Sequence, residues 1–162
     1  MRYRGLFMAG VATLVVGVAG LAVVSLVGLD AGAFGRYSSA GQRIYYTGIG
    51  DNGAPIARTS VGMGMMYVAT CVDCHAEDGR GGRVDTMMGW FDVPDIRYSE
   101  LTSPHTEDGE TTHGWTDADI RRAIRDGIEP NGERLKPPMP RWDMTDGEID
   151  EVIAYLKELS GR

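Results

Sequence analysis

The sequence predicts a mainly α-helical protein that begins with a membrane helix. Three observations lead to this prediction. Segments with helix-capping signals and one apolar face lie near 116–127 and 145–161, and an uncharged apolar run covers 5–29. The third observation is chemical, because two cysteines and a histidine fall within the pentapeptide Cys71-Val72-Asp73-Cys74-His75.

The N-terminal run is rich in Val, Leu, Ala and Gly and follows Arg2 and Arg4. About 20 apolar residues suffice to cross a bilayer, and positive residues on the short side keep that end in the cytoplasm. We therefore expect residues 1–29 to be a single-pass anchor in the inner (cytoplasmic) membrane, with the rest of the chain on the periplasmic side. The alternative is a cleaved signal peptide, since 31–33 is an Ala-Gly-Ala triplet of the kind found at cleavage sites.

Residues 30–60 are predicted to form a linker that contains a β-hairpin. Residues 31–41 are small and polar. Two short strands, 44–47 and 55–57, would flank a glycine-containing turn. Such a hairpin would cover a neighbouring surface or meet a partner. The main domain is then expected to occupy 61–162.

Two helices of this domain are predicted from their start signals. Thr145 precedes Glu148 by three positions, the spacing of a capping box, and Gly161 is the expected stop. Apolar residues recur between them at helical spacing: Ile149, Val152, Ile153, Leu156 and Leu159. A second helix is predicted to begin after Thr116 and to end at Gly127.

The polar face of this second helix carries Arg121, Arg122 and Arg125. This face is either solvated or a small basic docking surface on an acidic domain. A further helix is expected from about 62 into Cys71, and a short helix or turn is expected over 95–101.

The pentapeptide matches the C-x-x-C-H pattern of covalent haem attachment. Cys71 and Cys74 would form thioethers with one porphyrin, and the imidazole of His75 would bind its iron. These are the only two cysteines of the chain. A structural zinc site needs four ligands, and a thioredoxin-like redox pair needs a βαβ setting that the sequence lacks. A disulfide with an uninvolved histidine is the remaining alternative.

A methionine is the expected second iron ligand. Met139 stands between prolines in Lys136-Pro137-Pro138-Met139-Pro140, where restricted backbone torsions favour an extended strap that aims one thioether. Met144 is the reserve candidate. The methionines nearer the pentapeptide are expected to fill gaps in the core: Met63, Met65, Met66, Met87 and Met88.

From about Gly62 to Arg162 the chain resembles a class I, single-haem cytochrome c. The resemblance rests on the pentapeptide, the run Glu77-Asp78-Gly79-Arg80-Gly81-Gly82, the strap Met139-Pro140, and the closing helix with Val152-Ile153-Ala154-Tyr155-Leu156-Lys157. It implies three to five helices around one covalent haem c, with His75 and Met139 as the axial pair.

The resemblance also assigns Tyr67 as an aromatic residue of the first helix, which packs on the last helix. One position departs from the family pattern. Met63 stands where the family often has the glycine of this helix crossing, although Gly62 and Gly64 flank it.

An iron with both axial positions filled exchanges single electrons, so we expect an electron carrier rather than an enzyme. Family analogy gives as partners a quinol-oxidising complex upstream and a terminal oxidase downstream in a respiratory chain, or a dehydrogenase. The main alternative is a haem-bearing subunit of a larger oxidase or dehydrogenase complex. A gas sensor or peroxidase is a third hypothesis, and it would require a displaceable sixth ligand.

The net charge of −7 makes nucleic acid an implausible partner and favours a basic or mixed docking surface on another redox protein. The acidic stretch 107–110 is expected to be a solvated loop, or a second metal site with His105 and His113. Residues 79–82 are expected to form a turn. The sequence sets no oligomeric state.

Overall fold

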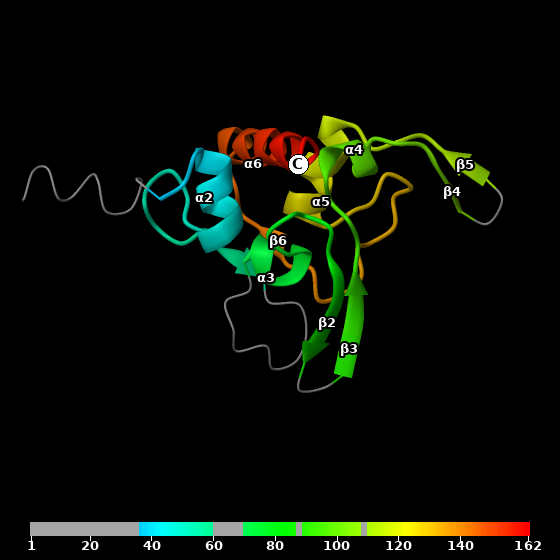
Figure 1. Cartoon of the computed structure of the whole chain (residues 1–162), viewed down its shortest axis with the longest axis horizontal. Coiled ribbons are helices and arrows are strands. Elements are labelled where there is room, and N and C mark those ends of the chain that lie inside the picture. Colours follow the sequence, from blue (N-terminus) through cyan, green and yellow to red (C-terminus); the bar gives the residue numbers. More distant parts are fainter. Residues whose placement is uncertain (1–35, 60–69, 87–88, 108–109) are drawn as a thin grey trace, which may run out of the picture. The chain divides into compact units, whose positions relative to one another are not determined.

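The computed structural model describes residues 36–59, 70–86, 89–107 and 110–162 (Figure 1). Ser38–Arg162 form one compact unit. The predicted membrane run 5–29 lies outside the described residues, as does nearly all of the predicted helix 62–71. Among the helices that are described, none combines the length and the hydropathy needed to cross a bilayer.

Helices α2 (Ala40–Thr47) and α6 (Asp146–Leu159) pack against each other (Figure 1). The side chain of Ser39 caps the start of α2 by accepting from the Gln42 amide, and Gly48 ends the helix in the left-handed conformation. The buried face of α2 includes Gly41 and Tyr45. The ring centroids of Tyr45 and of Tyr155 on α6 are 5.3 Å apart.

The prediction of a hairpin is therefore wrong for its first strand, because residues 44–47 are helical. Ile44 and Tyr45 have strand-forming side chains, but their burial against α6 decides the conformation over local propensity. The expected turn does exist, since Ile49 and Pro55 form an antiparallel bridge. The buried Arg43 guanidinium holds this turn by donating to the carbonyl of Ile49 at 2.7 Å and to Asp51 at 2.8 Å. The compact unit thus begins before residue 61.

The expected C-terminal helices are confirmed. Helix α5 (Asp117–Asp126) has a capping box at Thr116 and ends at Gly127 in the left-handed conformation. Helix α6 has the predicted capping box of Thr145 and Glu148, although its C-cap is Ser160. The short helix expected before residue 101 is α4 (Tyr98–Leu101).

The three arginines of α5 are engaged in ion pairs. Arg121 pairs with Asp150 at 2.5 Å, and Arg125 pairs with Asp146 at 2.7 Å, so both join α5 to α6. Arg122 pairs with Asp119 of its own helix at 3.0 Å. All three arginines on this face therefore have acidic partners, and this weakens the hypothesis of a basic docking surface.

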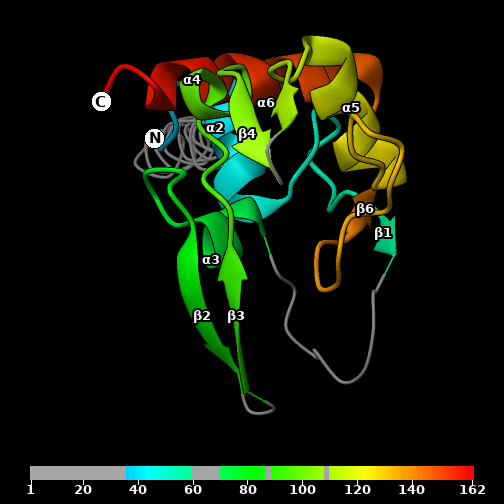
Figure 2. The same ribbon diagram turned by 90° about the vertical axis from the view of Figure 1, so that its right-hand side faces the viewer.

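Within the described residues, the strands form three two-stranded antiparallel sheets. β1 (Arg58–Thr59) pairs with β6 (Arg141–Trp142). The hairpin of β2 (Gly82–Thr86) and β3 (Gly89–Val93) extends away from α6 (Figure 2). β4 (His105–Glu107) and β5 (Glu110–Thr112) pair across the acidic stretch that was expected to be a loop.

The core lies between the helices and the β1–β6 pair. Its buried side chains come from α2, α5 and α6, from the residue two positions before β1, and from β6 and the residues just after it: Ile44, Tyr45, Ile56, Ile120, Trp142, Met144, Ile149, Val152, Ile153, Tyr155, Leu156 and Leu159. Cys71, Val72 and Met139 are partly buried against this cluster. The segments that carry the candidate site residues therefore border one common core.

Candidate functional site

Helix α3 (Cys71–His75) places both cysteines and the histidine on little more than one helical turn. Asp73, one of the two residues between the cysteines, fixes the start of this helix. Its carboxylate accepts from the Thr70 amide at 2.7 Å and from the Thr70 hydroxyl at 3.0 Å. The three-residue spacing of Thr70 and Asp73 could have been recognised as a capping signal from the sequence.

The two thiols are free, so the expected alternative of a disulfide is not observed. Burial raises the pKa of Cys71 to about 12 and raises that of Cys74 above its ordinary value. Both groups are therefore neutral thiols at pH 7. A reactive redox pair would need the opposite shift, because the thiolate is the reactive form.

The imidazole of His75 is buried, with 6% of the residue exposed. Its Nδ1 lies 3.1 Å from the carbonyl oxygen of Pro94. A carbonyl can only accept, so Nδ1 carries the proton and Nε2 keeps its lone pair. Burial lowers the pKa of His75, which favours the neutral ring. A neutral imidazole held through one nitrogen is the usual form of a metal-binding histidine.

Sequence reasoning missed Pro94, because its carbonyl approaches His75 only through the fold. The turn at 79–82, which was predicted, brings the two segments together. Gly81 donates to the His75 carbonyl at 3.0 Å and has a φ of +66°. A Cβ at Gly81 would lie 2.3 Å from the carbonyl oxygen of Val93, so only glycine fits this approach.

A second missed residue, Tyr45, fixes the chain just after His75. Its hydroxyl donates to the carbonyl of Ala76 at 2.7 Å. Ala76 has a φ of +62°, a conformation that non-glycine residues rarely adopt. Gly41 and Tyr45 are four residues apart, the same interval that separates position 63 from Tyr67 in the expected helix crossing. This spacing is the sequence signal that could have identified 40–47 as a helix that crosses the last helix. Tyr67 itself lies outside the described residues.

Met139 lies on the predicted proline strap, which in the structure is best taken as residues 135–141. The strap is not extended throughout, because Pro137 and Pro138, joined by a cis peptide, form a turn. The Met139 side chain is only partly buried against the core. Met144 is 4% exposed and belongs to the core itself. Its surroundings are already filled by protein side chains, whereas the Met139 side chain stays partly exposed at the edge of the core.

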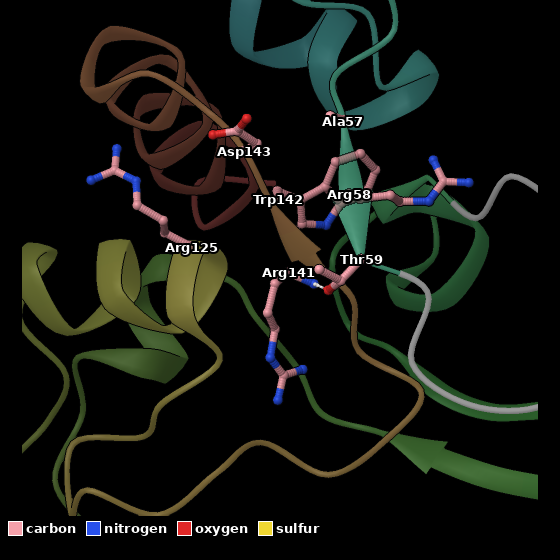
Figure 3. Close-up of a pocket in the computed structure, with 7 residues that line it drawn as sticks. All are labelled: Ala57, Arg58, Thr59, Arg125, Arg141, Trp142 and Asp143. Atoms are coloured by element: carbon pink, nitrogen blue, oxygen red, sulfur yellow. Dashed lines mark hydrogen bonds between the residues drawn. The ribbon is translucent and has the colours of Figure 1, made fainter.

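A pocket of about 400 Å³ lies elsewhere, beside β1, β6 and the end of α5 (Figure 3). It is lined by Ala57, Arg58, Thr59, Arg125, Arg141, Trp142 and Asp143. The guanidinium groups of its three arginines point in different directions and do not converge on one ligand (Figure 3). This pocket also contains none of the predicted haem-binding residues.

Across the described residues there is no group of three or more His, Cys, Asp or Glu side chains that could hold a metal ion. His113 is exposed, and its Nδ1 lies 3.0 Å from the Gly114 carbonyl. The side chains of 105–112 are not described. The second metal site considered near His105 therefore gains no support.

A family model described as cytochrome c oxidase, cbb3-type, subunit III, matches residues 63–156, more than half of the chain. No curated protein and no solved structure matches. The crossing of α2 with α6, the C-x-x-C-H helix and this match together define a cytochrome c domain of class I, a haem c protein that transfers electrons. Within that class, the chain belongs to the family of cbb3-type cytochrome c oxidase subunit III.

Proposed function

We propose that this chain carries single electrons through one haem c that is attached to Cys71 and Cys74 and bound axially by His75 and Met139. The observation that supports this most strongly is the state of His75. It is buried and neutral, and its Nδ1 is tied to Pro94, which leaves Nε2 for a metal. Haem c, when bound, supplies an iron that takes up and releases one electron.

The residues of the chain bind and orient this group. The free, neutral thiols of α3 are available for thioether formation, and the Asp73 cap fixes the helix that carries them. The bond from Nδ1 of His75 to Pro94 sets the ring orientation and makes Nε2 a better donor to the metal. Tyr45 fixes the turn after His75 to α2. The site is thereby organised by bonds from three separate segments: α3 with its cap, the segment of Pro94, and α2.

Met139 is favoured over Met144 by their surroundings. Met139 is partly buried at the edge of the core, whereas Met144 is enclosed within it. We expect Met139→Ala to lower the midpoint potential and to let the reduced protein bind carbon monoxide, because a thioether favours ferrous iron and blocks the sixth position.

The matched control is Met144→Ala. It should leave the haem spectrum and carbon monoxide binding unchanged, while it destabilises the domain by about 2–5 kcal/mol as a large-to-small core substitution. Measurement requires the reduced holoproteins, a carbon monoxide titration and a redox titration. An unchanged spectrum in Met139→Ala, or carbon monoxide binding by the unaltered protein, would refute the ligand assignment and favour a sensor or peroxidase.

We further propose that the chain is tethered by residues 1–29 to the inner membrane, with the haem domain on the periplasmic side. The apolar run behind Arg2 and Arg4 supports this location. A tether would raise the local concentration of the carrier near membrane-bound donors and acceptors, such as a quinol-oxidising complex and a terminal oxidase.

A second role is favoured by the family description, that of a haem-bearing subunit within a cbb3-type oxidase complex. The two roles can be separated by extracting native membranes in mild detergent and staining a native gel for covalent haem. Haem that migrates with the small chain alone supports the tethered carrier. Haem in a large band that also contains oxidase subunits supports the subunit role.

A further inference from the structure

The strap that carries Met139 has few backbone donors of its own. Three of its seven residues, from Leu135 to Arg141, are prolines, which lack an N–H group. The Met139 amide reaches the Lys136 carbonyl only at 3.4 Å. The carbonyl groups of the strap therefore depend on donors from other groups to hold their position.

The side chain of Arg141 supplies these donors. Its Nη1 donates to the carbonyl of Met139, and its Nη2 donates to the carbonyl of Leu135 at 3.2 Å. One planar guanidinium thus joins the beginning of the strap to the residue that carries the thioether. An ammonium group lacks two separated donor nitrogens in a fixed fork, so lysine would not reproduce this pair of bonds.

Arg141 is itself fixed by the end of α5. A Cβ placed on Gly127 would lie only 1.9 Å from Nε of Arg141, so the arginine side chain lies directly on this glycine. Gly127 also has a φ of +64°, and its carbonyl accepts from the Leu135 amide at 2.9 Å. On its other side, the Arg141 amide donates to the Thr59 hydroxyl at 3.2 Å. The guanidinium therefore acts from a rigid support.

We infer that Arg141 is a positioning residue for the axial thioether: its guanidinium clamps the strap through the Met139 and Leu135 carbonyls and so sets how firmly Met139 stays on the iron. This inference rests on the proposed ligand role of Met139. Arg141 does not touch the metal, and it acts only through the backbone of the strap.

The test is an imidazole titration of the ferric holoprotein, because imidazole must displace Met139 to bind. A looser strap makes displacement easier and lowers the apparent dissociation constant. We expect Arg141→Lys to bind imidazole about ten-fold more tightly than the unaltered protein, which corresponds to about 1.4 kcal/mol. If the lysine variant does not accumulate with haem, Arg141→Gln, which keeps a single donor group, is expected to shift the constant in the same direction.

The matched control is Arg58→Lys on the paired strand β1. The Arg58 guanidinium lies over the Trp142 ring, 5.3 Å from its centroid, and bonds to neither strap carbonyl in the described structure. Its replacement should leave imidazole binding unchanged. An equal effect of Arg58→Lys and Arg141→Lys would overturn the inference.

The same titration in the Met139→Ala background separates positioning from general destabilisation. With the thioether absent, Arg141→Lys should have no further effect on imidazole binding. A ten-fold effect that persists there would show that Arg141 acts on the fold and would refute the inference. If Met139→Ala alone left imidazole binding unchanged, the ligand assignment in the proposed function would fail instead.

Discussion

The crossing of α2 and α6 makes a sharp prediction for Gly41. A Cβ at this position would lie 1.9 Å from the carbonyl oxygen of Glu151, 2.5 Å from its carbonyl carbon and 3.0 Å from Cβ of Tyr155. The two nearest atoms belong to the backbone of α6 and cannot rotate away. Gly41→Ala must therefore push the helices apart by more than about 1 Å to restore ordinary contact distances.

The cost follows from what the crossing buries. Tyr45 and Tyr155 are both 0% exposed, and their ring contact would open as the helices separate. Overpacking of a core costs about 1–3 kcal/mol, and a clash with backbone belongs at the upper end of that range. We expect Gly41→Ala to lower the free energy of unfolding by about 3 kcal/mol, measured by urea denaturation of the holoprotein with far-ultraviolet circular dichroism.

Gly147→Ala provides the matched control, since Gly147 lies in α6 and a Cβ there would meet no atom within 4 Å. Alanine is the better helix former, so this variant should be neutral or more stable by up to about 1 kcal/mol. Equal stabilities of the two alanine variants would refute the assignment of Gly41 as the contact glycine of the helix crossing.

Two further predictions concern bonds that join α2 and its following turn to the rest of the domain. Burial alone would raise the pKa of Glu148, but hydrogen bonds from the amides of Thr145 and Asp51 outweigh it and hold this pKa below its ordinary value of 4.5. A lowered folded-state pKa stabilises the fold above the unfolded value and stops doing so as the pH falls through the folded value. Glu148→Gln should therefore destabilise the domain by about 1–3 kcal/mol at pH 7. In urea titrations this difference in unfolding free energy should shrink below about pH 4.5. A difference that stays constant down to about pH 3 would show that the Glu148 carboxylate is not what stabilises the fold. Tyr45→Phe removes the donor to the Ala76 carbonyl and should cost about 1 kcal/mol in the same assay, and no loss of stability would show that this bond contributes little.

The structure confirms those sequence-based predictions that depend on neighbouring residues. The helix start after Thr116, the capping box at Thr145 and the stop at Gly127 rest on bonds between residues at most four positions apart, so their spacing in the chain already specifies them. The pentapeptide is equally local, because five consecutive residues contain both thiols and the imidazole. Its assignment as the haem site stays a prediction, and so does the ligand role of Met139.

The sequence was least informative where distant segments decide the structure. Residues 44–47 have the composition of a strand, yet they form a helix because α6 buries them. The arginines of α5 lie on a part-exposed face, as expected, but the carboxylates of α6 that pair with two of them are contributed by a separate segment. No sequence pattern within either segment indicates that it contacts α6.

Three features can be read from residue order alone: the C-x-x-C-H pentapeptide, the helix boundaries at 116–127 and after Thr145, and the proline-rich segment around Met139. Each of these depends on covalent order and on bonds within about one helical turn. Three other features emerge only from the folded chain: Pro94 accepts from His75, Gly41 lies against α6, and Arg141 bonds to the strap carbonyls. These contacts join residues from separate segments, and such contacts form only once the shared core has brought the segments together.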